Sequence, residues 1–81
     1  MAKRSPKHGG DQTLMALGNS IRSVRRKVYL SQEGLALEAQ LDRSYVGGVE
    51  RGEHNLTLIN LCKIADSLGL TPSDLLRDAG L

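Results

Sequence analysis

Residues 32–52 read QEGLALEAQLDRSYVGGVERG, and this stretch predicts two short helices separated by a three-residue turn. Each predicted helix has only a narrow apolar face, formed by Leu35, Ala36 and Ala39 in the first and by Val46 and Val49 in the second. Ser31 and Asp42 stand where N-caps are needed, and Gly52 is placed to end the second helix. A narrow apolar face leaves the outer side of the second helix free to enter a groove of DNA.

Three further helices are predicted around this pair. A stripe with helical spacing marks a helix before it, carried by Leu14, Leu17, Ile21, Val24 and Val28. Thr57 is the expected N-cap of a helix that runs to Leu68, with Leu58, Leu61, Ala65 and Leu68 facing inward and Gly69 as its end. The sequence TPSD at residues 71–74 has the capping residue, proline and carboxylate that begin a last helix. The predicted fold class is therefore all-α, a compact domain of five helices with short connections.

Composition excludes several kinds of protein. The chain has 81 residues, no Phe and no Trp, so one small aliphatic core is the most that it can build. Cys62 is the only cysteine and His8 and His54 are the only histidines, which excludes an internal disulfide and leaves no metal-ligand spacing and no expected cofactor. Neither a secretory signal core nor a membrane-spanning apolar run is present, and a free cysteine suits a reducing compartment, so the expected location is the cytoplasm.

Charge is unevenly distributed along the chain. Residues 1–30 carry seven basic side chains and one acidic one, whereas residues 31–81 carry four basic and eight acidic ones. Residues 1–13 contain proline, two glycines and several cations without apolar periodicity, and we expect a flexible basic arm there, with the folded domain at 14–81. Lys3, Arg4 and Lys7 of that arm are candidates for phosphate contacts, with a passive tail as the alternative.

The stretch at 32–52 resembles the lambda-repressor-like, Cro/C1-type helix-turn-helix domains. The residues that match are Gln32, Leu35-Ala36, Leu41, Val46, Val49-Glu50 and Gly52, and the likeness extends to Arg25 and to the five-helix layout over residues 14–78. Within that family, the sequence LDRSYVGGVERGEHNLTL at residues 41–58 is similar to the small controller proteins of restriction–modification systems, which are homodimers. Two positions depart from the pattern. Gln40 stands where the turn ordinarily has glycine, so it must either adopt the left-handed conformation or shift the turn slightly. Gly47-Gly48 lies inside the recognition helix, where it either lets the backbone approach DNA or removes base contacts.

The resemblance implies a DNA-binding surface built from nine residues. They are Gln32, Asp42, Arg43, Ser44, Tyr45, Gly48, Arg51, His54 and Asn55. Arg43 is the side chain best shaped to bind guanine in the major groove, and Gln32 begins a helix whose free amides face a phosphate. Tyr45 is expected either to touch DNA or to pack at the flank of the helix, and Asn55 either to contact the sugar-phosphate chain or to cap the next helix.

Arg25 and Glu50 are interpreted as a partly buried structural ion pair and not as an acid and base for catalysis. No paired carboxylates, phosphate-binding glycine loop or nucleophile with a nearby base is present, so the sequence argues against an enzyme. The favoured function is a transcriptional regulator that binds a palindromic operator as a homodimer through its C-terminal helices. The alternatives are an antitoxin or prophage-type repressor that also binds a protein, and a helical adaptor that has lost DNA binding. RNA polymerase is a further candidate partner.

Overall fold

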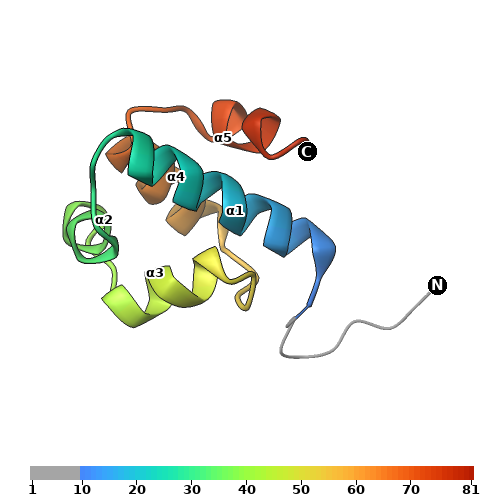
Figure 1. The fold of residues 1–81 in the computed structure, drawn as a ribbon, viewed down its shortest axis with the longest axis horizontal. Helices are drawn as coiled ribbons and strands as arrows, with labels where there is room; N and C mark the ends of the chain where they lie inside the picture. The colour runs from blue at the N-terminus through green and yellow to red at the C-terminus, as the bar shows by residue number, and fades with distance from the viewer. Residues whose placement is uncertain (1–9) are drawn as a thin grey trace.

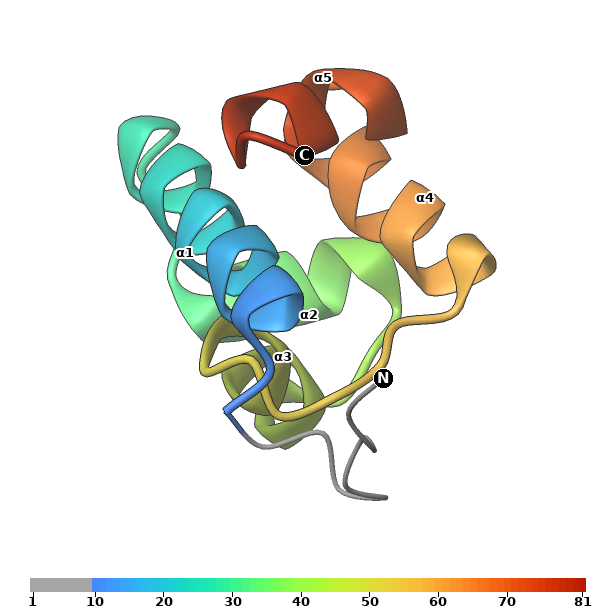
Figure 2. The same cartoon turned by 90° about the vertical axis from the view of Figure 1, so that its right-hand side faces the viewer.

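The computed structural model describes residues 10–81, and these residues form five helices without any strand (Figure 1). The helices are α1 (Gln12–Lys27), α2 (Gln32–Ala39), α3 (Arg43–Glu50), α4 (Leu58–Ser67) and α5 (Pro72–Asp78). The all-helical five-helix prediction is confirmed. In both Figure 1 and Figure 2, α3 and α5 lie at opposite ends of the domain, with α1 and α4 between them.

The first helix begins earlier than the sequence pattern predicted. Asp11 is its N-cap, and one carboxylate oxygen of Asp11 accepts hydrogen bonds from the backbone N–H groups of Thr13 (2.9 Å) and Leu14 (3.2 Å). Gln12 and Thr13, which we expected at the end of the arm, therefore belong to α1, because this cap recruits them into the helix. Residues 1–9, with the cations of the expected arm, lie outside the described residues, and the role of the arm stays a prediction.

The core is aliphatic and draws on every helix. Its buried members are Leu17, Ile21, Leu35, Ala36, Ala39, Val46, Val49, Leu61, Ile64, Ala65, Leu68 and Leu75. Two residues expected to face inward do not: Val28 is 44% exposed and Leu58 is 71% exposed. Both stand at the ends of their helices, Val28 as the C-cap of α1 and Leu58 as the first residue of α4.

All five helices end in the same hydrogen-bonded closure, which needs one residue in the left-handed conformation. After α3, α4 and α5 that residue is glycine, with φ between 76° and 80°. After α1 it is Tyr29 (φ 60°), and after α2 it is Gln40 (φ 59°). Gln40 therefore adopts the left-handed conformation, and the turn is not shifted. This conformation costs a residue with a side chain about 1–2 kcal/mol.

The helices α1 and α3 are in close contact because Gly18 has no side chain. A Cβ atom at this position would lie 2.5 Å from the carbonyl oxygen of Val49 and 2.6 Å from that of Glu50. The backbone of α1 thus passes directly against the last turn of α3. This contact fixes the C-terminal end of α3, where Glu50 lies.

Candidate nucleic-acid interface

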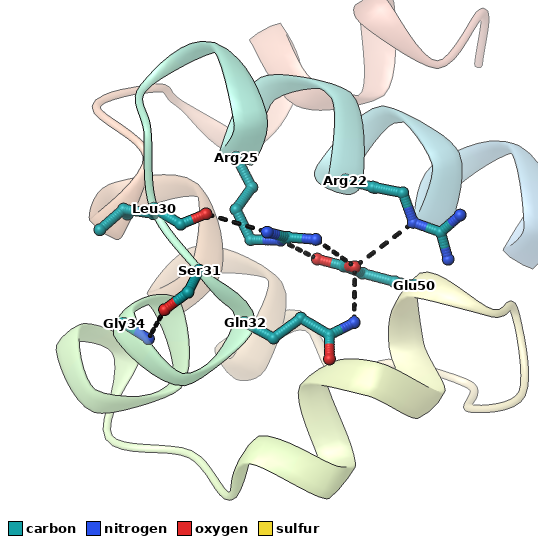
Figure 3. A network of polar contacts seen from close by, with 7 residues as sticks. All are labelled: Arg22, Arg25, Leu30, Ser31, Gln32, Gly34 and Glu50. Atoms are coloured by element: carbon teal, nitrogen blue, oxygen red, sulfur yellow. Dashed lines mark hydrogen bonds and ion pairs between the residues drawn. The ribbon is translucent and has the colours of Figure 1, made fainter.

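A buried ion pair anchors the C-terminal end of α3 (Figure 3). Glu50 is the last residue of α3 and is only 1% exposed. Arg25 of α1 donates to both of its carboxylate oxygens, from Nε to Oε2 at 2.6 Å and from Nη2 to Oε1 at 3.0 Å. The structure thus contains the ion pair expected between these residues, in the planar two-bond geometry that guanidinium and carboxylate groups favour.

Further hydrogen bonds extend this ion pair into a network that joins three helices. Arg25 Nη1 donates to the carbonyl oxygen of Leu30 (2.9 Å), and Gln32 Nε2 donates to Glu50 Oε1 (2.9 Å). Burial alone would raise the pKa of Glu50, but the hydrogen bonds from Arg25 and Gln32 outweigh burial and hold that pKa below its ordinary value. Glu50 is therefore ionised at neutral pH and holds α1, α2 and α3 in one arrangement.

The network also includes Arg22, which the sequence reading missed. Its Nε lies 3.5 Å from Glu50 Oε1, the same oxygen that Gln32 binds, and 36% of its side chain is exposed. Figure 3 shows the Nη atoms of Arg22 directed away from the carboxylate. Because Arg25 already neutralises Glu50, Arg22 adds a positive charge beside Gln32. One feature of the sequence could have indicated Arg22: it lies about one helical turn before Arg25, off the apolar stripe of α1.

The first turn of α3 is open to solvent. Asp42, Arg43 and Ser44 are all exposed, and Arg43 and Ser44 have no hydrogen-bond or ion-pair partner within residues 10–81. Asp42 is the N-cap residue of α3, as expected, although its side chain makes no capping hydrogen bond. The side chains of Arg43 and Ser44 are therefore free of competing polar contacts within the part of the chain that the structure describes.

Tyr45 packs against the loop that follows α3. Its side chain is half-buried, its ring stacks on that of His54 with centroids 4.9 Å apart and planes 19° apart, and its hydroxyl oxygen accepts a hydrogen bond from Asn60 Nδ2 (3.1 Å). Of the two roles considered for Tyr45, the packed one is present in the structure. No pattern in the sequence pointed to Asn60, which reaches Tyr45 from α4.

The two glycines of α3 border different neighbours. A Cβ atom at Gly48 would collide with Nε2 of His54, and one at Gly47 would lie 3.2 Å from Arg51 Nη1 and 3.6 Å from Gln32 Oε1. The His54 ring packs against Gly48, and the DNA contact expected at Gly48 stays a prediction. The absence of a side chain at Gly48 leaves room for the ring of His54. Neither of the two reasons considered for the Gly47-Gly48 pair had included this contact.

The positive charge of the loop after α3 is partly neutralised by an acidic residue of the same loop. Arg51 forms a two-bond ion pair with Glu53, with Nε to Oε2 at 2.8 Å and Nη2 to Oε1 at 3.1 Å. The hydrogen bond from Arg51 lowers the pKa of Glu53, so this exposed partner is ionised. Asn55 is exposed and does not cap α4, since Thr57 accepts the capping bond from the Asn60 N–H at 3.1 Å.

The expected site residues thus fall on one face of α3 and on the two edges of that face, which we call its rims. Arg43, Gly47 and Arg51 recur at four-residue spacing along the helix, with Gln32 of α2 beside Gly47. Tyr45 and His54 lie on the other rim, on the side of Gly48. Asn55 is the expected residue for which no contact ties it to either rim within the described part of the chain.

Comparison with known proteins identifies the family of this domain. The helix-turn-helix family profile matches residues 21–75. The control protein C.MunI of Mycoplasma sp is 44% identical over 62 residues, which are 75% of this chain and 84% of that protein. The control protein C.BamHI of Bacillus amyloliquefaciens is 43% identical over 63 residues, 76% of this chain and 78% of that protein.

Solved structures show the same likeness. The restriction-modification controller protein C.AhdI from Aeromonas hydrophila superposes with a TM-score of 0.75 at 48% identity, covering 76% of this chain and 94% of that one. The controller C.Esp1396I, solved bound to a 25 base pair operator site, superposes with a TM-score of 0.75 at 30% identity, covering 83% of this chain and 88% of that one. The chain belongs to the Cro/C1-type helix-turn-helix family.

Proposed function

We propose that this protein is a DNA-binding transcriptional regulator of the restriction–modification controller type, which binds a palindromic operator as a homodimer. The observation that carries the proposal is the contrast along α3. Its first turn exposes Arg43 and Ser44 without partners among the described residues, while its last residue, Glu50, is buried and held by Arg25. An exposed polar turn on a rigidly anchored helix is suited to reading base edges, because its side chains need not be released from other contacts.

The arrangement of the two rims supports roles in DNA binding for the remaining residues. With the first turn of α3 in the major groove, Arg43 binds guanine O6 and N7, and Ser44 contacts a neighbouring base or phosphate. Gln32, at the start of α2, faces the phosphate chain on one side of the groove, and the free Nη atoms of Arg22 add charge there. Arg51 binds a phosphate only after it releases Glu53, and this requirement weakens its contribution to DNA binding.

The homodimer is supported by apolar side chains that the monomer leaves uncovered. Of the two isoleucines of α4, Ile64 is fully buried, whereas Ile59 is 66% exposed and its neighbour Leu58 is 71% exposed. Leu81 at the C-terminus is 55% exposed. Two copies joined on a two-fold axis would double the length of DNA that is read, with half-sites about 34–36 Å apart. RNA polymerase would be a further partner if the regulator activates transcription.

The test is selection of bound duplexes from a random-sequence pool, followed by sedimentation of the protein alone and on the selected DNA. We expect a two-fold-symmetric consensus and a species of twice the 8.8 kDa chain mass at micromolar concentration. Ile59→Glu should split the dimer and weaken operator binding at least tenfold while the helical circular dichroism is unchanged. Leu37→Glu on α2, which also replaces an exposed apolar residue with one negative charge but lies outside the C-terminal helices, is the control for dimer formation.

Two results would overturn parts of this proposal. A monomer on the selected operator would remove the homodimer and favour a repressor that depends on a protein partner, as in an antitoxin or prophage-type role. No enrichment of any duplex at low salt would remove DNA binding altogether and favour the helical adaptor. No helix within residues 10–81 is long and apolar enough to cross a membrane.

A further inference from the structure

The rim of α3 opposite Gln32 contains a polar cluster that the proposed base reading does not use. We define the Tyr45 clamp as Tyr45, His54 and Asn60, which come from α3, the following loop and α4. The ring of Tyr45 stacks on His54, and the hydroxyl oxygen of Tyr45 accepts from Asn60 Nδ2 at 3.1 Å. Gly48 completes the clamp, because any side chain there would displace the His54 ring.

The direction of the hydrogen bond decides what the Tyr45 hydroxyl can still do. A phenol has one O–H donor and also accepts. Asn60 uses the accepting side, so the proton of the hydroxyl is not used within the clamp. The stacked ring limits rotation of the Tyr45 side chain, which is half-buried.

The position of the clamp indicates the chemical group that it would bind. Gly47 and Gly48 are adjacent in α3 but border opposite sides, with Gln32 near the first and His54 near the second. When the face between them enters a groove, the two rims approach the two phosphate chains that border it. Tyrosine hydroxyls are among the common donors to DNA phosphate oxygens.

We propose that Asn60 and His54 are positioning residues that hold the Tyr45 hydroxyl as a preset donor to a DNA phosphate, on the side of the groove opposite Gln32. This inference rests on the proposed function, since it requires that α3 enters the major groove. It assigns a role in DNA binding to Asn60, a residue of α4 that contacts no base or phosphate itself. It also explains the glycine at position 48 without invoking close approach of the backbone to DNA.

A double-mutant cycle on the selected operator tests the proposal. Tyr45→Phe keeps the stacked ring and removes the donor, and we expect binding to weaken about fivefold, as for loss of one hydrogen bond. Asn60→Ala should weaken binding about threefold in the otherwise unchanged protein, and it should have no further effect in the presence of Tyr45→Phe. Ser67→Ala is the control on α4, because Ser67 bonds only to the carbonyl of Lys63 within the same helix.

The salt dependence of binding separates positioning from a general electrostatic effect. Tyr45 and Asn60 are uncharged, so neither variant should change the slope of log K against log salt, whereas loss of a cationic phosphate contact lowers it by about 0.9. The proposal is overturned if Asn60→Ala weakens binding equally with and without Tyr45→Phe, which would mean that Asn60 binds DNA directly. It is also overturned if Asn60→Ala lowers the melting temperature without changing affinity. If the unmodified protein binds no duplex, the proposed function itself fails.

Discussion

The two ends of α3 are built in opposite ways. At its N-terminal end Asp42, Arg43 and Ser44 are exposed, and no side-chain hydrogen bond caps the helix. At its C-terminal end Glu50 is buried and receives hydrogen bonds from two other helices. The difference shows how a helix of only eight residues can present a reading surface, since its position is fixed by one end and its chemistry is displayed at the other.

Breaking the anchored end should have the largest effect on stability. Arg25→Met removes the partner of a buried carboxylate, and we expect the free energy of unfolding to fall by about 3–5 kcal/mol, because a buried charge is left uncompensated. Thermal or urea unfolding followed by circular dichroism measures the loss. Arg26→Met, which removes an exposed arginine from the same helix, is the control and should change little. A fully stable Arg25→Met protein that no longer binds DNA would make Arg25 a binding residue and not an anchor.

Acid should weaken the same end without a mutation. The pKa of Glu50 is lower in the folded protein than in the unfolded chain, where it is about 4.3. The carboxylate therefore contributes its full stabilisation above that pH and loses it as pH falls through the lower, folded value. The difference in unfolding free energy between the unmodified protein and Glu50→Gln should be constant near neutral pH and shrink below about pH 4. A difference that stays constant to pH 3 would show that the charge of Glu50 does not stabilise the fold.

Breaking the exposed end should affect recognition and leave the fold intact. Arg43→Ala should weaken binding to the selected operator by about 1–3 kcal/mol and relax the preference at one base pair of each half-site. Its melting temperature should match that of the unmodified protein, because Arg43 has no partner within residues 10–81. Equal weakening on operator and on unrelated DNA would instead identify Arg43 as a phosphate contact.

The turn between α2 and α3 offers a smaller test of how firmly the reading helix is held. Gln40 has φ 59°, so Gln40→Gly should relieve strain and raise the free energy of unfolding by about 0.5–1 kcal/mol. Gly69→Ala is the reverse control, since Gly69 has φ 76° and open space around its Cβ position, and it should be destabilising through the backbone alone. A Gln40→Gly protein of unchanged or lower stability would indicate that the side chain of Gln40 compensates for the strain.

Periodicity and capping chemistry in the sequence were sufficient for the five helices, most of the core and the pairing of Arg25 with Glu50. These features depend on local rules: apolar residues at helical spacing, N-caps such as Ser31 and Thr57, and a charge at the edge of a stripe that requires a partner. The resemblance to helix-turn-helix domains also directed attention to Arg43 and Ser44, which the structure leaves exposed.

The contacts between α3 and its neighbours became known only from the tertiary structure. Asn60 meets Tyr45 across 15 residues and His54 covers Gly48 from the following loop, while Arg22 shares a carboxylate oxygen with Gln32 from another helix. Val28 and Leu58 continue apolar stripes but are exposed at the ends of their helices. A linear pattern states which side of a helix is apolar, but the packing of separate helices determines where that side is covered and which polar groups meet at its edge.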